Sequence, residues 1–190
     1  MRRTHAILLS LLAPASAQAQ APAVYRPNTV LADLGLHVIS LGYQRTVDRF
    51  LSLQASAGLY VPWLINGNVG GLAGEEPQPQ RGVQGGVLRL RCFLHPLGRA
   101  PGGLWVSPFT QLGLVSGRRE PETVLGSTFA VGLSLGWAWR LRERWLISLG
   151  AGGQLHRAAF AGPAGGPGST EAPGFVRFGP TVDLNTGFAF

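Results

Sequence analysis

The chain has 190 residues, which is the length of one ordinary domain. It contains 28 Gly and 14 Pro, a content that excludes a helical bundle, and it has no G-X-Y period that would indicate collagen. Hydrophobic residues make up 45% of the chain and charged residues 13%, so the composition also argues against intrinsic disorder. All 16 basic residues are Arg and there is 1 Cys, which excludes lysine chemistry, an intramolecular disulfide and a zinc site built from several cysteines.

The first residues have the pattern of a secretory signal peptide. Arg2 and Arg3 precede a short apolar run, and Ala17-Gln18-Ala19 fits the small-x-small cleavage pattern. The apolar run is too short to cross a hydrocarbon core of about 30 Å as a helix. The segments that we expect are a cleaved signal peptide, a short N-terminal lead and one folded domain, at 1–19, 20–27 and 28–190.

Most of the remaining chain alternates between large apolar residues and small or polar ones, which is the period of β-strands. The clearest stretch is 129–141, where every odd position is large and apolar and every even position is small or polar. We expect Leu133 and Leu135 on one face of this strand and Ser134 and Gly136 on the other. The same pattern predicts eight strands in all, at 28–35, 37–46, 50–62, 83–94, 104–116, 126–141, 145–157 and 174–190.

The composition of the two faces favours a membrane barrel over a soluble β-sandwich, which remains the alternative. Gly, Ala, Ser and Gln dominate the polar face, and such residues suit a narrow barrel interior. Leu, Phe and Trp dominate the other face and suit contact with lipid. In a membrane we expect Leu135→Arg to cost roughly 2–4 kcal/mol. We expect Ser134→Ala, a change inside the barrel, to cost about 1 kcal/mol or less.

The connections between the expected strands alternate in length, as in outer-membrane barrels, where turns on the periplasmic side are short and extracellular loops are long. Short connections follow the second, fourth and sixth strands, and longer ones are expected at 63–82, 117–125 and 158–173. The first hairpin has one strong turn residue, Gly35. The prediction is an all-β fold, an eight-stranded antiparallel up-and-down transmembrane β-barrel after a cleaved signal peptide.

Aromatic residues fall near the ends of the expected strands, where belts form at the two membrane interfaces. One belt is expected at the end with the short turns and the other at the opposite end. The first comprises Tyr43, Trp139, Trp145 and Phe190, and the second comprises Trp63 and Phe129.

Several short motifs resemble, in order and spacing, a domain-of-unknown-function family of small bacterial outer-membrane proteins, related in architecture to the OmpA- and OmpW-like barrels. The motifs are Asn28, Ser52-Leu53 to Pro62-Trp63, Gly136 to Trp145, Gly150-Ala-Gly152 and Phe178-Gly-Pro-Thr181. The chain departs from the family at strand positions where carboxylates are expected, which here hold Gln44, Arg89 and Ser148. The resemblance implies a location in the bacterial outer membrane and recognition of the terminal Phe190 by the outer-membrane assembly machinery. It implies no activity.

Polar residues on the expected inner face are the candidate site. They are Asp33, Gln54, Arg89, Arg91, Gln111, Arg140, Gln154, His156, Arg177 and Asp183. A buried charge must be paired or solvated. The residues are therefore interpreted as a packed polar interior, because an eight-stranded barrel is just wide enough to be filled by side chains. The alternative is a narrow Arg-lined passage for anions or small solutes, which the excess of Arg over Asp keeps open.

The sequence predicts no catalytic, cofactor or metal site. His37, His95 and His156 lie in three separate segments, and no Gly-x-Ser-x-Gly motif is present. The Arg residues form no basic helix or stripe, so the high isoelectric point does not indicate nucleic-acid binding. We expect a non-catalytic structural or interaction barrel that contacts outer-membrane lipids and presents extracellular loops. The alternatives are a small-solute channel and, third, a lipid-modifying enzyme.

Overall fold

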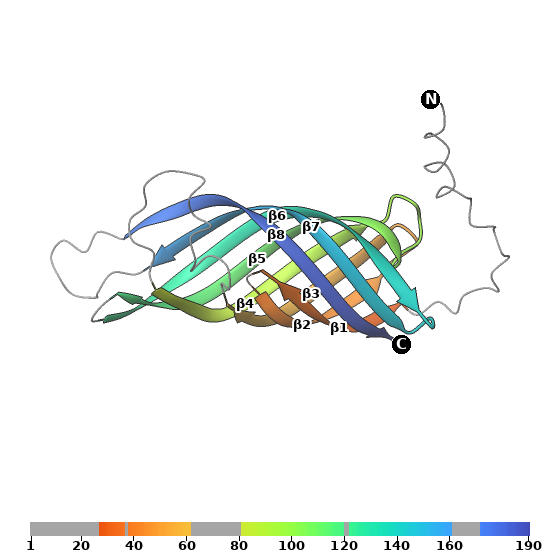
Figure 1. Ribbon diagram of the computed structural model, residues 1–190, viewed down its shortest axis with the longest axis horizontal. Coiled ribbons are helices and arrows are strands. Elements are labelled where there is room, and N and C mark those ends of the chain that lie inside the picture. Colours follow the sequence, from red (N-terminus) through yellow and green to blue (C-terminus); the bar gives the residue numbers. More distant parts are fainter. Residues whose placement is uncertain (1–26, 37, 62–80, 120–121, 161–171) are drawn as a thin grey trace, which may run out of the picture.

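The computed structural model describes residues 27–36, 38–61, 81–119, 122–160 and 172–190. Within these residues no helix is long and apolar enough to cross a membrane. The regular structure consists of eight β-strands (Figure 1). They are β1 (Asn28–Gly35), β2 (Val38–Thr46), β3 (Leu51–Tyr60), β4 (Arg81–Leu94), β5 (Gly103–Arg119), β6 (Glu122–Leu141), β7 (Trp145–Phe160) and β8 (Ala172–Ala189).

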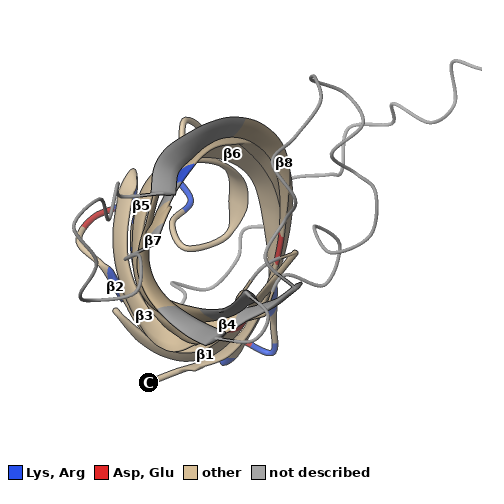
Figure 2. Cartoon of the chain, turned by 90° about the vertical axis from the view of Figure 1, so that its left-hand side faces the viewer, with Lys and Arg blue, Asp and Glu red and all other residues tan. Residues whose placement is uncertain are grey.

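The strands form a closed up-and-down barrel in chain order, with each strand antiparallel to its neighbours. The last strand closes the sheet on the first, with Thr29 opposite Ala189 and Asp33 opposite Asn185. Figure 2, seen nearly along the barrel axis, shows the closed ring of strands. Closure leaves no open sheet edge, so every strand has a hydrogen-bonding partner on both sides. The fold predicted from the sequence, a closed antiparallel barrel, is confirmed.

The first hairpin forms where the sequence placed it. β1 ends at Gly35 and β2 begins at Val38, and the ladder between them extends to Leu34 opposite Ile39. The two strands expected over this stretch are therefore confirmed, and the even number of strands that a closed antiparallel barrel requires is reached.

The expected loop at 117–125 is wrong. β5 continues to Arg119 and β6 begins at Glu122, and the two are paired as Arg118 with Thr123 and Arg119 with Glu122. Charged and turn-favouring residues suggested a loop here, but the ladder of the longest hairpin continues through them. β7 and β8 likewise extend beyond their expected ends, and Figure 1 shows these long strands projecting past β1–β3 at the end opposite the C-terminus.

The short connections at 47–50, 95–102 and 142–144 lie at one end of the barrel, together with the C-terminus. In the first of them the Asp48 carboxylate accepts hydrogen bonds from the backbone N–H groups of Phe50 (2.6 Å) and Leu51 (2.9 Å). In the third, Arg142 and Glu143 have positive φ angles of 49° and 60°, the backbone that tight hairpin turns require. We call this end the turn end and the opposite end the loop end.

Side chains alternate between the interior and the outer surface as the sequence predicted. Ser134 is 1% exposed, whereas its neighbours Leu133 and Leu135 are each 55% exposed. Large apolar side chains cover the outer surface, and Leu114 and Phe178 are among the most exposed. The expected belt residues within the described part are exposed, namely Tyr43, Phe129, Trp139, Trp145 and Phe190, and Trp63 lies outside it.

Candidate functional site

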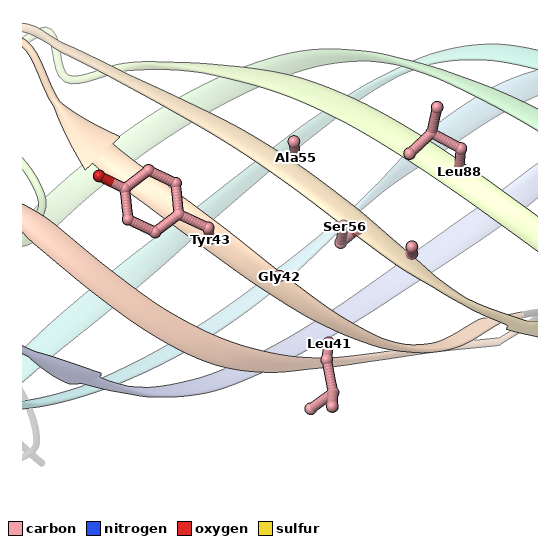
Figure 3. Close-up of a pocket in the computed structure, with 7 residues that line it drawn as sticks. Leu41, Gly42, Tyr43, Ala55, Ser56 and Leu88 are labelled. Carbon is pink, nitrogen blue, oxygen red and sulfur yellow. The ribbon is translucent and has the colours of Figure 1, made fainter.

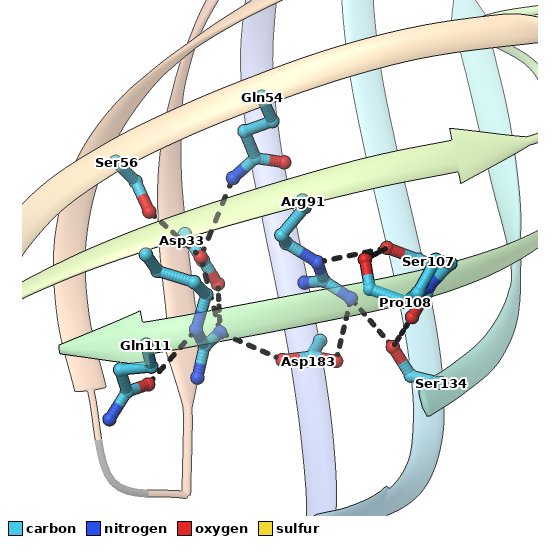
Figure 4. Close-up of polar contacts among 10 residues, drawn as sticks. Asp33, Gln54, Ser56, Arg91, Ser107, Pro108, Gln111, Ser134 and Asp183 are labelled. Carbon is cyan, nitrogen blue, oxygen red and sulfur yellow. Dashed lines mark hydrogen bonds and ion pairs between the residues drawn. The ribbon is translucent and has the colours of Figure 1, made fainter. Parts of the chain in front are cut away.

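Arg89 of β4 is held inside the barrel by two carboxylates from other strands. Its Nη1 lies 3.3 Å from Oδ2 of Asp33 on β1 and 3.1 Å from Oδ1 of Asp183 on β8. Its Nε donates a hydrogen bond to Oε1 of Gln111 on β5 at 3.1 Å. Gln54 adds a long contact of 3.5 Å to Asp33. Because β4 and β8 lie on opposite sides of the barrel, these contacts span the interior (Figure 4).

Arg91, two residues further along β4, makes the second half of the network. Its Nη2 donates to Oδ2 of Asp183 at 3.0 Å and to Oγ of Ser134 at 2.7 Å, and its Nε donates to Oγ of Ser107 at 3.2 Å. Ser134 therefore binds a buried charge, and the small cost expected for Ser134→Ala is too low, since a hydrogen bond to a charged group contributes about 1.5–3 kcal/mol. Asp183 bridges both guanidinium groups (Figure 4).

The charges of this layer balance. Arg89 and Arg91 carry two positive charges, and Asp33 and Asp183 carry two negative charges within ion-pairing distance. Each of these four residues is at most 3% exposed. Burial of ion pairs is tolerated when the geometry is good and most of the remaining donors are satisfied. Here the ion pairs measure 3.0–3.3 Å, and the exception is Nη1 of Arg91, which is buried without a hydrogen-bond partner among the described residues.

Two apolar clusters close the interior on either side of the charged layer. Phe93, Trp105, Ala138 and Leu146 form one at the turn end. The other, at the loop end, consists of Val38, Tyr60, Val87 and Val115. The charged network therefore lies between two apolar layers. A cavity of about 10 Å³, room for about one water molecule, lies between the turn-end cluster and the polar side chains of Gln44, Ser148 and Asn185.

Aromatic rings inside the barrel complete the surroundings of Arg91. Its guanidinium carbon lies 4.9 Å from the ring centre of Phe93, 5.6 Å from Trp105 and 5.5 Å from Phe109. Large aromatic residues were expected on the lipid side, and these three were not expected in the interior. The signal was present in the alternation, because Phe93 follows Arg91 by two residues and therefore shares its face.

Glycines opposite the internal indole make room for it. A Cβ added at Gly136 or Gly150 would overlap the ring of Trp105, which is fully buried. The two glycines are paired across β6 and β7. Gly136 is the direct partner of Trp105 in the β5–β6 ladder, so small residues on the next two strands accommodate this large side chain.

Four of the expected interior residues are not in the network. Gln154 is buried on β7, opposite Gly132 of β6. Arg140 lies half-buried at the turn end, and its Nη2 is 3.4 Å from the backbone oxygen of Glu143. His156 stacks on Tyr60 at the loop end, with 5.9 Å between the ring centres. Arg177 is opposite His156 in the ladder, and its side chain lies outside the described part. The excess of interior Arg expected from the sequence is therefore not found in the charged layer.

The described residues contain no group of three or more His, Cys, Asp or Glu side chains that could hold a metal ion. The chemistry of the charged layer is that of mutual neutralisation, because each guanidinium faces carboxylate, amide or hydroxyl oxygens. Among the expected site residues, the structure brings together Asp33, Gln54, Arg89, Arg91, Gln111 and Asp183.

Comparison with known proteins gives a shared fold. No family model matches the chain, and no curated protein matches it, so the sequence resemblance has no support beyond the architecture. The structure is similar to the crystal structure of the N-terminal β-barrel domain of Pseudomonas aeruginosa OprF, with a TM-score of 0.52, 14% identity, and coverage of 86% of this chain and 95% of that one. The crystal structure of Acinetobacter baumannii CarO gives a TM-score of 0.45 at 11% identity, covering 90% of this chain and 100% of that one. The chain thus has the β-barrel fold seen in the OprF domain.

Proposed function

We propose that this protein is a small bacterial outer-membrane β-barrel with a closed, non-conducting interior and a non-catalytic structural or interaction role. The membrane part of the proposal is supported by the outer surface, where Leu, Val, Phe and Trp side chains surround the barrel. Such a surface would aggregate in water but matches lipid. The similarity to the OprF barrel domain supports the architecture.

The observation that carries the closed interior is the position of the ion pairs between two apolar layers. A conducting passage needs solvated polar groups along its length, whereas Trp105 and Val38 at the two ends of the interior are both 0% exposed. The guanidinium groups between them are already neutralised by carboxylates. An Arg-lined anion channel therefore has less support than a filled barrel.

A conductance measurement distinguishes a filled barrel from an Arg-lined anion channel. In planar lipid bilayers we expect the purified protein to insert without opening a channel, because a buried apolar layer lies on each side of the charged network. A matched control is the Trp105→Ala variant, which removes the largest side chain of the turn-end layer and is the change that should first admit water. Steady single-channel currents from the wild-type protein would overturn the closed interior.

The location has its own test. The signal-peptide pattern at 1–19 and the apolar outer surface support export to the outer membrane. We expect the protein to fractionate with outer membranes and to migrate faster on gels before boiling than after it. Recovery of the folded protein in the soluble periplasm would overturn the location.

The proposed partner in assembly is the outer-membrane insertion machinery, acting on Phe190. The side chain of Phe190 is 53% exposed at the turn end, and its backbone N–H donates to the carbonyl oxygen of Asn28 at 2.9 Å. Deletion of Phe190 should lower the amount inserted in cells while barely changing the urea midpoint of the refolded protein. Deletion of one residue within 161–171 is the control, and equal insertion of the two variants would refute the role of Phe190.

A further inference from the structure

The outer face of the β2–β3 hairpin carries a groove where the neighbouring surface carries large side chains. It is lined by Leu41, Gly42, Tyr43, Ala55, Ser56, Ala57 and Leu88, and its volume is about 340 Å³. Figure 3 shows Leu41, Tyr43 and Leu88 extending outward around a floor of Gly42, Ala55 and Ser56. In the ladders Ala57 lies between Leu41 on β2 and Leu88 on β4. The groove exists because the β3 residues at its centre are alanines.

A cationic side chain follows the groove toward the turn end. Arg45 shares the outer face of β2 with Leu41 and Tyr43, and it is exposed. Among the described residues its guanidinium has no ion-pair partner. The nearest turn adds Arg49, whose guanidinium lies 4.6 Å over the ring of Phe50.

Other charged groups of this turn do not neutralise these arginines. The one carboxylate of the β2–β3 turn, Asp48, accepts hydrogen bonds from the backbone N–H groups of Phe50 and Leu51. Tyr43, between the groove and Arg45, donates its hydroxyl to Oδ1 of Asn28 at 2.6 Å. From the middle of the barrel outward, the hairpin therefore presents an apolar groove, then a phenol, then two cations.

We propose that this face is a binding site for one phospholipid of the leaflet on the turn side, with an acyl chain in the groove and the phosphate at Arg45. The proposal rests on the proposed membrane location. Four residues of a strand span about 13 Å, or roughly 10 Å along the membrane normal at the usual strand tilt. If Arg45 lies at the level of the headgroups, the groove at Leu41 therefore lies within the hydrocarbon of the same leaflet. The site therefore presents an apolar groove and then a cation about 10 Å further along the membrane normal, which matches the acyl chain and the phosphate of a phospholipid.

Native mass spectrometry of the purified protein in detergent micelles tests the site. The probe is dioleoyl phosphatidylglycerol, and dioleoylglycerol, with the same tails and no phosphate, is the control ligand. We expect one phosphatidylglycerol to remain bound to the wild-type protein and dioleoylglycerol to bind more weakly. Ala57→Trp should fill the groove and remove the adduct, and Arg45→Gln should lower the affinity about fivefold.

Two control variants make the same kinds of change at exposed positions outside the groove. Ala151→Trp adds the same bulk to another outward alanine, on β7, and Arg142→Gln removes an exposed charge from another turn. Both should retain the adduct. Equal loss of lipid in all four variants, no discrete adduct on the wild type, or a dimer that Ala57→Trp dissociates would each overturn the inference.

Failure of this inference is distinguishable from failure of the proposed function. A protein that inserts into bilayers and migrates faster before boiling, but holds no discrete lipid, would reject the lipid site and leave the membrane barrel intact. A protein that folds in water without detergent or lipid would reject both. Because Arg45 is exposed, Arg45→Gln tests the site even if Ala57→Trp does not fold.

Discussion

Asp183 is the residue whose loss should disturb the barrel interior most. It binds Arg89 at 3.1 Å and Arg91 at 3.0 Å, and all three side chains are nearly inaccessible to solvent. Asp183→Asn leaves two guanidinium groups sharing Asp33 alone. Removing one partner of a buried ion pair typically costs about 3–5 kcal/mol, because the remaining charge stays buried without compensation. We expect a loss of that size in the free energy of unfolding.

Asp33→Asn is the matched control for this change. Asp33 contacts Arg89 at 3.3 Å and has further contacts of 3.5 Å to Gln54 and Ser56, and it makes no hydrogen bond with Arg91. After its neutralisation Arg89 retains Asp183 and Gln111. The cost should therefore be smaller, near the 1.5–3 kcal/mol of a hydrogen bond to a charged group.

A double variant separates charge imbalance from simple loss of contacts. Arg91→Gln combined with Asp183→Asn leaves Arg89 facing Asp33, so the layer is again neutral. Its cost should be well below the sum of the two single changes, since the residues are directly coupled. Urea titration of the protein refolded in dilauroyl phosphatidylcholine vesicles, followed by Trp fluorescence, measures all four variants.

A small loss of stability in Asp183→Asn would refute the closed, charged interior. If Asp183→Asn costs less than about 1 kcal/mol, the ion pairs behave like exposed surface pairs. Water would then reach Arg89 and Arg91, and the interior would not be closed.

Three further predictions use the same urea titration. Gly150→Ala should cost about 1–3 kcal/mol, because the new Cβ overlaps the buried indole of Trp105. Gly86→Ala should be nearly neutral, because nothing lies within 4 Å of a Cβ there. Equal urea midpoints of the two variants would contradict this packing. Leu135→Arg should cost roughly 2–4 kcal/mol in vesicles, whereas Ser148→Ala on the inner face should cost about 1 kcal/mol or less, and the reverse order would reject the assigned faces. Burial lowers the pKa of His95, in the turn after β4, so the unfolded chain binds the proton more readily and stability should fall as the pH drops below about 6.5. His95→Gln should remove that part of the pH dependence, and an unchanged slope would show that His95 is not its source.

The strands and their faces were predictable because a half-buried strand repeats every two residues. The alternation around Leu133, Ser134 and Leu135 assigns the outward and interior faces without any knowledge of neighbouring strands, and the structure confirms these faces. The ends of the strands were less predictable. Turn-favouring residues such as Gly117 suggested a loop, but cross-strand pairing extends the β5–β6 hairpin past them. Local propensity is overridden there by the neighbouring strand.

The interior network was predictable in membership and not in arrangement. Alternation shows that Arg89, Arg140 and His156 face inward, but it does not show at which level of the barrel each one lies. That level depends on the register and tilt of strands distant in the chain. The register places Arg89 at the height of Asp183, and it places Arg140 at the turn end beside Glu143. The expected excess of interior charge came from counting residues that lie in different layers.

The same limit explains the missed aromatic residues. The sequence contains many aromatics, and a lipid-facing role is the common one in membrane barrels. Whether a ring fits inside depends on the residues of the neighbouring strands. Trp105 fits because Gly136 and Gly150 leave space for it, and these glycines belong to strands that follow it by tens of residues. Their pairing is a property of the folded barrel.

The charged interior layer does not contribute to the high isoelectric point of the chain, which is near 11.2. The interior layer is neutral, so the charge excess lies elsewhere. The exposed charged residues of the turn end comprise five arginines and two carboxylates, Arg45, Arg49, Arg99, Arg142, Arg144, Asp48 and Glu143. In the proposed membrane location this cationic rim lies at the level of lipid phosphates, which attract each exposed Arg by about 1 kcal/mol where the membrane surface is anionic. Arginine suits both places, because its guanidinium stays charged when buried and binds two oxygens at once, as Arg91 does with Asp183 and Ser134.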